Sequence, residues 1–77
     1  MYYVYALQSM SRNYIYVGLT NNIERRLKEH NSGHNVRTRA YRPFKIIRTE
    51  EHPDRPSART REKYLKSGVG KEFLKQL

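Results

Sequence analysis

Five side chains in this sequence have the chemistry needed to cut a phosphodiester bond. They are Tyr5, Tyr16, Arg26, His30 and Glu62. The two phenols and the imidazole can accept or relay a proton, and the guanidinium is a fixed cation that can hold a phosphate. The carboxylate is a lone acid in a strongly basic stretch and can ligate a divalent metal ion. Together these residues predict metal-assisted hydrolysis, provided that the fold brings them together.

A tyrosine needs help to act as a base at neutral pH. The phenol of a free tyrosine has a pKa of about 10, so only about one phenol in a thousand is ionised. A positive charge close to the ring favours the phenolate, and the available sources are Arg26 and a metal ion on Glu62. The sequence does not decide whether Tyr5 or Tyr16 acts on the attacking water.

Each candidate, taken alone, also has an ordinary structural explanation. Tyrosines are common in strands, and an exposed arginine on a helix is usually just solvated. A histidine such as His30, near a helix C-terminus, complements the helix dipole. Glu62 has the spacing to pair with Arg59 or Lys66 along one helix. Only the joint pattern favours catalysis.

The elements that must position these residues begin with a predicted β-hairpin. Tyr2–Gln8 and Tyr14–Leu19 are rich in aromatic and β-branched residues, and the polar segment Ser9–Asn13 between them favours a turn. Alternation along the strands places Tyr5 and Tyr16 on one face of the hairpin. The opposite face is apolar and consists of Val4, Ala6, Ile15, Val17 and Leu19.

A helix is predicted over Asn22–Ser32, with Asn21 as its N-cap and Gly33 as its left-handed stop. Arg26 and His30 are four residues apart in it and therefore lie on one face. Further along, the pattern predicts a third strand, a long helix and a short last helix. Their expected ranges are Phe44–Thr49, Ser57–Lys66 and Gly70–Gln76. The prediction is an α+β fold, a three-stranded antiparallel β-sheet flanked by α-helices, forming a single domain over residues 1–77.

The charge of the chain indicates a polyanionic partner. Sixteen Lys and Arg against seven Asp and Glu give a net charge of +9. Such a charge attracts nucleic acid at long range and makes its binding dependent on salt. The polar segment before the third strand and the first positions of that strand supply the expected nucleic-acid contacts. These are Arg37, Arg39, Arg42 and Lys45.

Composition also bears on location. The chain has no cysteine, which fits a reducing compartment and leaves no thiolate for a metal. No apolar run approaches the ~20 residues that a membrane-spanning helix needs. We therefore expect a cytoplasmic protein with no membrane association.

Four blocks of the sequence together resemble the GIY-YIG nuclease superfamily, in particular its small free-standing members. The blocks are Tyr3-Val4-Tyr5, Tyr16-Val17-Gly18, Thr20–Gly33 and Arg61–Gly68. The resemblance implies the α+β fold predicted above and catalysis with Mg²⁺ or Mn²⁺. One departure is Tyr3, which stands where the superfamily motif has glycine.

The same resemblance implies a role for each candidate. Tyr5 or Tyr16 orients or deprotonates the attacking water, and Arg26 holds the scissile phosphate. His30 relays a proton, and Glu62 ligates the metal ion.

The sequence thus predicts a metal-dependent endonuclease that acts on DNA rather than RNA. We expect low sequence specificity, because a chain of this length has no room for an attached DNA-reading module; a protein partner is one source of specificity. Selectivity for distorted or branched structures and a role in DNA repair complete this hypothesis. The alternative is a non-catalytic basic module of the same fold that binds DNA or RNA, and a basic adaptor for a larger assembly is a third reading.

Overall fold

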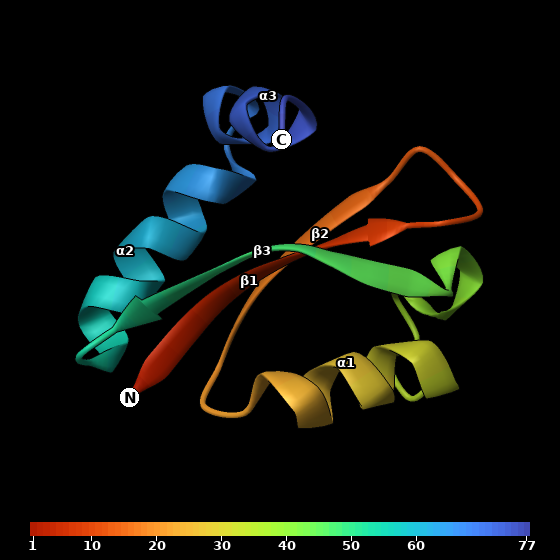
Figure 1. Cartoon of the computed structure of the whole chain (residues 1–77), viewed down its shortest axis with the longest axis horizontal. Coiled ribbons are helices and arrows are strands. Elements are labelled where there is room, and N and C mark those ends of the chain that lie inside the picture. Colours follow the sequence, from red (N-terminus) through yellow and green to blue (C-terminus); the bar gives the residue numbers. More distant parts are fainter.

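The computed structural model describes residues 1–77 and has the predicted α+β architecture, a three-stranded antiparallel sheet with helices on both sides. Figure 1 shows α1 against one face of the sheet, and α2 and α3 against the other. In chain order the elements are β1 (Tyr2–Ser9), β2 (Ile15–Thr20), α1 (Ile23–Ser32), the 3₁₀ helix η1 (Arg39–Tyr41), β3 (Phe44–His52), α2 (Arg55–Lys66) and α3 (Gly68–Lys75).

Strand β1 is the centre of the sheet, and the strand order is β2-β1-β3. Both of its neighbours run antiparallel to it, and Tyr5 stands opposite Gly18 of β2 and Thr49 of β3. The four residues Val4 to Leu7 are all buried, because β1 is covered on both faces and has a partner on each side. Strands β2 and β3 are left as the two edges of the sheet.

The two faces of the sheet support separate cores. On the α2 side the predicted apolar face of the hairpin packs against the last two helices, in a cluster of Val4, Ala6, Ile15, Val17, Ala58, Leu65 and Leu74. On the α1 side the core is aromatic. Its buried members are Tyr5, Leu7 and Phe44, and Tyr14, Tyr16, Leu27 and Tyr41 pack around them. The alternation read from the sequence therefore sorts the side chains of β1 and β2 correctly.

Helix α1 begins one residue later than the sequence suggested. Asn22, not Asn21, is the N-cap, and its side-chain oxygen accepts a hydrogen bond from the Arg25 amide at 3.1 Å. The reason lies in the preceding turn, where the Thr20 hydroxyl accepts from the Asn22 amide at 3.0 Å and so places this residue at the cap. Gly33 ends the helix with a φ of 85°, as predicted.

Side-chain contacts fix α1 to the sheet. Asn31 pairs with the backbone of Phe44 at the start of β3, and its side-chain oxygen accepts from the Phe44 amide at 2.7 Å. This contact holds the C-terminal half of α1, which carries His30, against the sheet.

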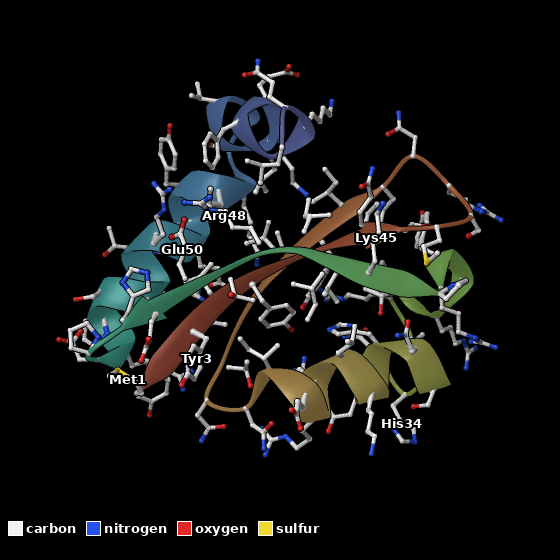
Figure 2. All side chains as sticks on the ribbon, in the orientation of Figure 1. Met1, Tyr3, His34, Lys45, Arg48 and Glu50 are labelled. Carbon is white, nitrogen blue, oxygen red and sulfur yellow. The ribbon has the colours of Figure 1, made fainter.

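The last three elements are longer than predicted. β3 continues to His52 instead of ending at Thr49, because Glu50 ties the end of the strand to α2. Its carboxylate accepts hydrogen bonds from Arg61 of α2 at 2.7 and 3.1 Å, and from Arg48 at 2.5 Å. Figure 2 shows Arg48 and Glu50 on the part of β3 that lies beside α2.

The boundaries of the last two helices also differ from the prediction. The Asp54 side chain caps α2 and moves its start to Arg55. Ser67 both ends α2 and caps α3, so α3 begins at Gly68 rather than at Gly70. None of the helices combines the length and apolar character that crossing a bilayer requires.

Candidate active site

Tyr5 lies at the centre of the site and is almost completely buried, with 1% of its surface exposed. Its hydroxyl group is 3.2 Å from Nε2 of His30, which comes from α1. Its ring lies across Gly18 of β2, where a Cβ would stand 2.5 Å from the phenol oxygen. Glycine is therefore needed at position 18, because the Tyr5 ring occupies the space that a side chain would fill.

Burial decides the protonation state of Tyr5. Loss of hydration raises the pKa of Tyr5 to about 12, although the nearby Arg26 guanidinium acts in the opposite direction. The expected lowering by Arg26 is thus outweighed, and Tyr5 is a neutral phenol at physiological pH. A neutral, buried phenol can donate or pass on a hydrogen bond, but it does not reach solvent.

His30 is fully buried and uses both of its ring nitrogens. Nε2 meets the Tyr5 hydroxyl, and Nδ1 is 2.9 Å from the Thr38 hydroxyl. Burial and the positive charge of Arg26 hold the pKa of His30 below its usual range, so the ring is neutral at physiological pH. The three side chains form one buried hydrogen-bonded chain from Thr38 through His30 to Tyr5.

Thr38 is a site residue that the sequence did not reveal. It lies in the polar segment before η1, has no exposed surface, and its side chain makes its hydrogen bond to His30. No local pattern distinguishes it from the other hydroxyl residues of the chain. Only the folding of this segment against α1 brings Thr38 to the imidazole.

Tyr16 is the more accessible of the two tyrosines. It is half-buried, and its ring lies 4.7 Å from the His30 ring and 6.1 Å from the Tyr5 ring, measured between centroids. Its position on the edge strand β2 gives it access to solvent, which the central strand denies to Tyr5. The structure thus separates two tyrosines that the sequence could not tell apart.

Arg26 stands beside this aromatic cluster with 31% of its side chain exposed. One guanidinium nitrogen is 2.7 Å from the Glu29 carboxylate, one turn further along α1. The charge of Arg26 acts on both Tyr5 and His30. Tyr5, Tyr16, Arg26 and His30 therefore meet in one place, on the α1 side of the sheet.

Glu62 comes from the other side of the sheet, on α2. Its side chain is only 7% exposed, and its carboxylate is 3.0 Å from Arg59 and 3.4 Å from Lys66. These are the two helical partners that its spacing suggested. Lys66 also lines a pocket together with Tyr16, which links the surroundings of Glu62 to the edge of β2.

The donor set suits one kind of metal ion. No three His, Cys, Asp or Glu side chains come together as a ready-made cluster. Mg²⁺ and Mn²⁺ need less, because Mg²⁺ keeps several waters and is commonly held by one or two carboxylates and by substrate phosphates. Glu62 fits that requirement as a single hard oxygen ligand, and its two partners are exposed enough to move, at 58% for Arg59 and 50% for Lys66.

The four predicted nucleic-acid contacts do not form one patch. All are exposed. Arg37 lines the same pocket as Tyr16. Arg39 and Arg42 lie near the C-terminal end of α1, where the Arg42 guanidinium passes close to Gly33. Lys45 is on β3, the edge strand on the far side of β1.

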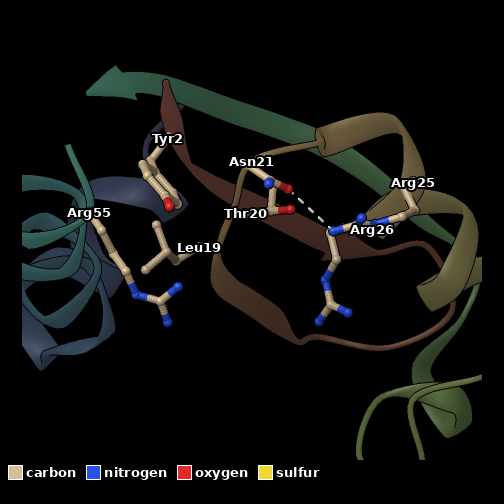
Figure 3. Close-up of a pocket in the computed structure, with 7 residues that line it drawn as sticks. All are labelled: Tyr2, Leu19, Thr20, Asn21, Arg25, Arg26 and Arg55. Carbon is tan, nitrogen blue, oxygen red and sulfur yellow. Dashed lines mark hydrogen bonds between the residues drawn. The ribbon is translucent and has the colours of Figure 1, made fainter. Parts of the chain in front are cut away.

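A second pocket lies at the other end of β2, with a volume of about 350 Å³. Figure 3 shows Arg26 and Arg55 reaching it from α1 and α2, on opposite sides of Leu19. Its other lining residues are Tyr2, Thr20, Asn21 and Arg25. Its lining has three arginines and no acid; Arg25 and Arg26 pair with Glu29 of α1, and Arg55 has no ion-pair partner.

Comparison with known proteins places the whole arrangement in one family. The chain is 39% identical over 67 residues to a UPF0213 protein of Clostridium perfringens, covering 86% of this chain and 71% of the relative. It is 37% identical over 67 residues to a UPF0213 protein of Natronomonas pharaonis, covering 86% and 78%.

A solved structure of a UPF0213 protein also resembles this chain. The solution NMR structure of a UPF0213 protein of Bacillus halodurans matches 99% of this chain and 84% of its own, with 34% identity and a TM-score of 0.58. Residues 1–75 match the GIY-YIG catalytic domain, which takes in all five candidate residues. The chain belongs to the GIY-YIG family, a nuclease superfamily whose members typically use divalent metal ions.

Proposed function

We propose that this protein is a metal-dependent endonuclease that hydrolyses phosphodiester bonds of DNA. The observation that carries the proposal is the convergence at His30. This buried imidazole is bonded to Tyr5, lies against Tyr16 and feels the charge of Arg26. Three separate elements, β1, β2 and α1, supply these residues. Packing of the sheet alone does not require the buried hydrogen bonds that join Thr38, His30 and Tyr5.

In this mechanism the exposed members of the cluster touch the substrate. Arg26 binds the scissile phosphate, and its guanidinium offsets the negative charge that builds up in the transition state. Tyr16 orients or deprotonates the attacking water, because it is the tyrosine that reaches the surface.

The buried members hold the arrangement in place. Arg26 is only a donor, so the Tyr5 oxygen can accept a hydrogen bond from it while the Tyr5 hydroxyl donates one to Nε2 of His30. Nδ1 of His30 then carries the hydrogen and donates it to Thr38. Tyr5 and His30 act in this scheme as a neutral hydrogen-bonded relay that holds Arg26 in place.

Glu62 is the proposed ligand for Mg²⁺ or Mn²⁺. The bound ion would neutralise charge on the phosphate and assist the departing oxygen. For this the Glu62 carboxylate has to exchange Arg59 and Lys66 for the cation and a substrate oxygen. Substrate and metal ion are therefore expected to bind together rather than separately.

The scope of the proposed activity follows from the surface. We expect little sequence preference, because the contact proposed for Arg26 is with a phosphate, and phosphate contacts carry no sequence information. We propose action on DNA in preference to RNA, selectivity for distorted or branched structures, and a place in DNA repair in the cytoplasm. A partner protein would supply any further specificity.

The test is nicking of supercoiled plasmid and cleavage of a labelled branched duplex by pure protein, with Mg²⁺, with Mn²⁺ and with a chelator. Arg26→Ala and Glu62→Ala proteins, purified in the same way, control for nucleases from the expression host. Metal-dependent nicking that both substitutions abolish is the expected result. Cleavage that persists in both variants would show that the activity belongs to a contaminant.

A second function is favoured by the state of Glu62. Its carboxylate is already paired with two cations, which is the resting state of a structural glutamate. In that case the same fold binds DNA or RNA without cutting it. The signs of this function are salt-sensitive binding that survives Tyr16→Phe and Glu62→Ala, with no cleavage under any metal condition.

A further inference from the structure

Two basic pockets lie at opposite ends of β2 and are built in the same way. The first, at the end of the strand, takes Arg25 and Arg26 from α1 and Arg55 from α2. The second, at the start of the strand, has a volume of about 340 Å³ and combines Tyr14, Tyr16 and Arg37 with Lys66 and Lys71. Both pockets thus bridge the two layers of the fold across the open edge of β2.

Neither pocket has a carboxylate in its lining, although five cationic side chains besides Arg26 line them. Arg55 and Arg37 have no ion-pair partner in the protein. In the second pocket, burial lowers the pKa of Lys71, and the charges of the neighbouring Lys66 and Lys75 act in the same direction. Arg25 pairs with Glu29 and Lys66 with Glu62, so the charge without an ion-pair partner is that of Arg55 in the first pocket and of Arg37 and Lys71 in the second. The Lys71 ammonium donates a hydrogen bond to the Ile15 carbonyl. The unpaired charge favours the binding of an anion from outside the protein.

The spacing between the pockets suits a nucleic-acid strand. Ile15 lines one pocket and Leu19 the other. Four residues of a β-strand span about 13 Å, which is of the order of the distance between phosphates a few nucleotides apart on one DNA strand. The two pockets therefore stand a few nucleotides apart. Tyr16 belongs to one pocket and Arg26 to the other, so the proposed point of cleavage lies between them.

We propose that the edge of β2 is the track for one DNA strand, with backbone phosphates bound on either side of the cut. Arg55 and Arg25 hold a phosphate at the end of β2, and Lys71 and Arg37 hold another at its start. The aromatic ring of Tyr14 lies in the same pocket, stacked on Tyr41 at 4.1 Å between centroids, and its centroid is 5.9 Å from the Lys71 ammonium. This inference rests on the proposed function and assigns its substrate-binding residues.

The proposal changes which residues carry binding. Of the four contacts expected from the sequence, only Arg37 lies on the track. Lys45 is on the opposite edge of the sheet, and Arg39 and Arg42 lie beyond the C-terminal end of α1. Arg55 and Lys71 are predicted to matter more than any of these three.

The experiment measures binding of a fluorescent DNA oligonucleotide in chelator, so that cleavage plays no part. Arg55→Gln and Lys71→Gln are compared with Lys63→Gln, which removes an exposed charge of the same kind from α2 outside both pockets. At 0.1 M salt each track variant should raise the Kd about fivefold and lower the slope of log Kd against log salt by about 0.7. Lys63→Gln should change neither quantity appreciably.

Neutral methylphosphonate groups placed singly along the oligonucleotide then locate each contact. For the wild-type protein, substitution at two separate positions a few nucleotides apart should weaken binding. Arg55→Gln should lose sensitivity at one of them and Lys71→Gln at the other. Equal effects of all three variants, or sensitivity spread evenly along the strand, would overturn the track.

The readout is independent of the nuclease proposal. Position-specific binding without any metal-dependent cleavage would refute the endonuclease and leave the track standing. Metal-dependent cleavage with an unchanged Kd and KM in Arg55→Gln and Lys71→Gln would support the endonuclease and refute the track.

Discussion

The ring of Tyr5 occupies the space where a side chain of Gly18 would be. The two residues face each other across β1 and β2, and a Cβ at position 18 would lie 2.5 Å from the Tyr5 oxygen and from Cζ. The glycine and the tyrosine of the two sequence motifs are thus one structural unit. Each is needed so that the phenol can reach His30.

Gly18→Ala should displace Tyr5 and disturb the site from within. The buried ring has no free space to move into, so we expect a loss of about 1–3 kcal/mol in the free energy of unfolding. Nicking should fall together with stability. Chemical denaturation measures the first effect, and Gly68→Ala is the control.

Gly68 starts α3, and no atom lies within 4 Å of the place that a Cβ would take there. Alanine at this position should therefore leave stability unchanged or raise it by up to ~1 kcal/mol. A Gly18→Ala protein as stable as the wild type would contradict the close approach of Tyr5.

Removing the two phenol groups one at a time should separate their roles. Tyr16→Phe should lower the nicking rate by at least ~100-fold with little change in stability, because the lost group acts on the water. Tyr5→Phe should cost about 1 kcal/mol of stability, because Nε2 of His30 loses its partner, and should reduce nicking less. Single-turnover nicking and denaturation curves of both variants give the comparison. A larger rate loss for Tyr5→Phe would reverse the assignment.

Thr38→Val should measure how much the hydrogen bond between Thr38 and His30 contributes to stability. Valine has the same shape but leaves Nδ1 of His30 without a partner in a buried place, at a cost of about 1–3 kcal/mol. Thr38→Ser keeps the hydroxyl and should restore most of that loss. Nitrogen NMR of the His30 ring adds a readout beyond stability, since the proposed relay requires the hydrogen on Nδ1.

The matched control for Thr38→Val is Thr49→Val, at an exposed position of β3. A loss of stability equal to that of Thr38→Val would show that the hydrogen bond to His30 contributes nothing of its own.

Glu50→Gln should remove most of the acid sensitivity that this carboxylate confers. Arg61 and Arg48 lower the pKa of Glu50 to about 2, against an ordinary value of 4.5. A depressed carboxyl pKa stabilises the fold above pH ~4.5, and this contribution disappears as the pH falls from about 4.5 toward 2. We expect a loss of about 2 kcal/mol at neutral pH in the variant, after allowing for the partly exposed arginines.

Thermal unfolding of Glu50→Gln followed between pH 2 and pH 7 should therefore show a flatter profile than that of the wild type. Glu51→Gln, on the next, exposed position of β3, should keep the wild-type profile. Parallel profiles for wild type and Glu50→Gln would mean that the ion pairs with Arg48 and Arg61 contribute nothing to the fold.

The sequence by itself determined the elements and the sides on which their residues lie. Alternation in β1 and β2 sorted Val4 and Val17 from Tyr5 and Tyr16, and this pattern is local because successive strand residues point to opposite faces. Gly33 marked the end of α1 for an equally local reason, its left-handed φ. The spacing of Arg26 and His30 placed both on one face of a helix.

Tertiary structure decided everything that depends on which element covers which. β1 became the central strand, so Tyr5 lost its water and its pKa rose, whereas Tyr16 stayed at the edge. Thr38 met His30 only because a loop folds back on α1. The cations of α1, α2 and α3 gathered along the edge of β2 for the same reason. Burial and proximity between distant segments arise from the packing of the layers, which no local pattern in the chain encodes.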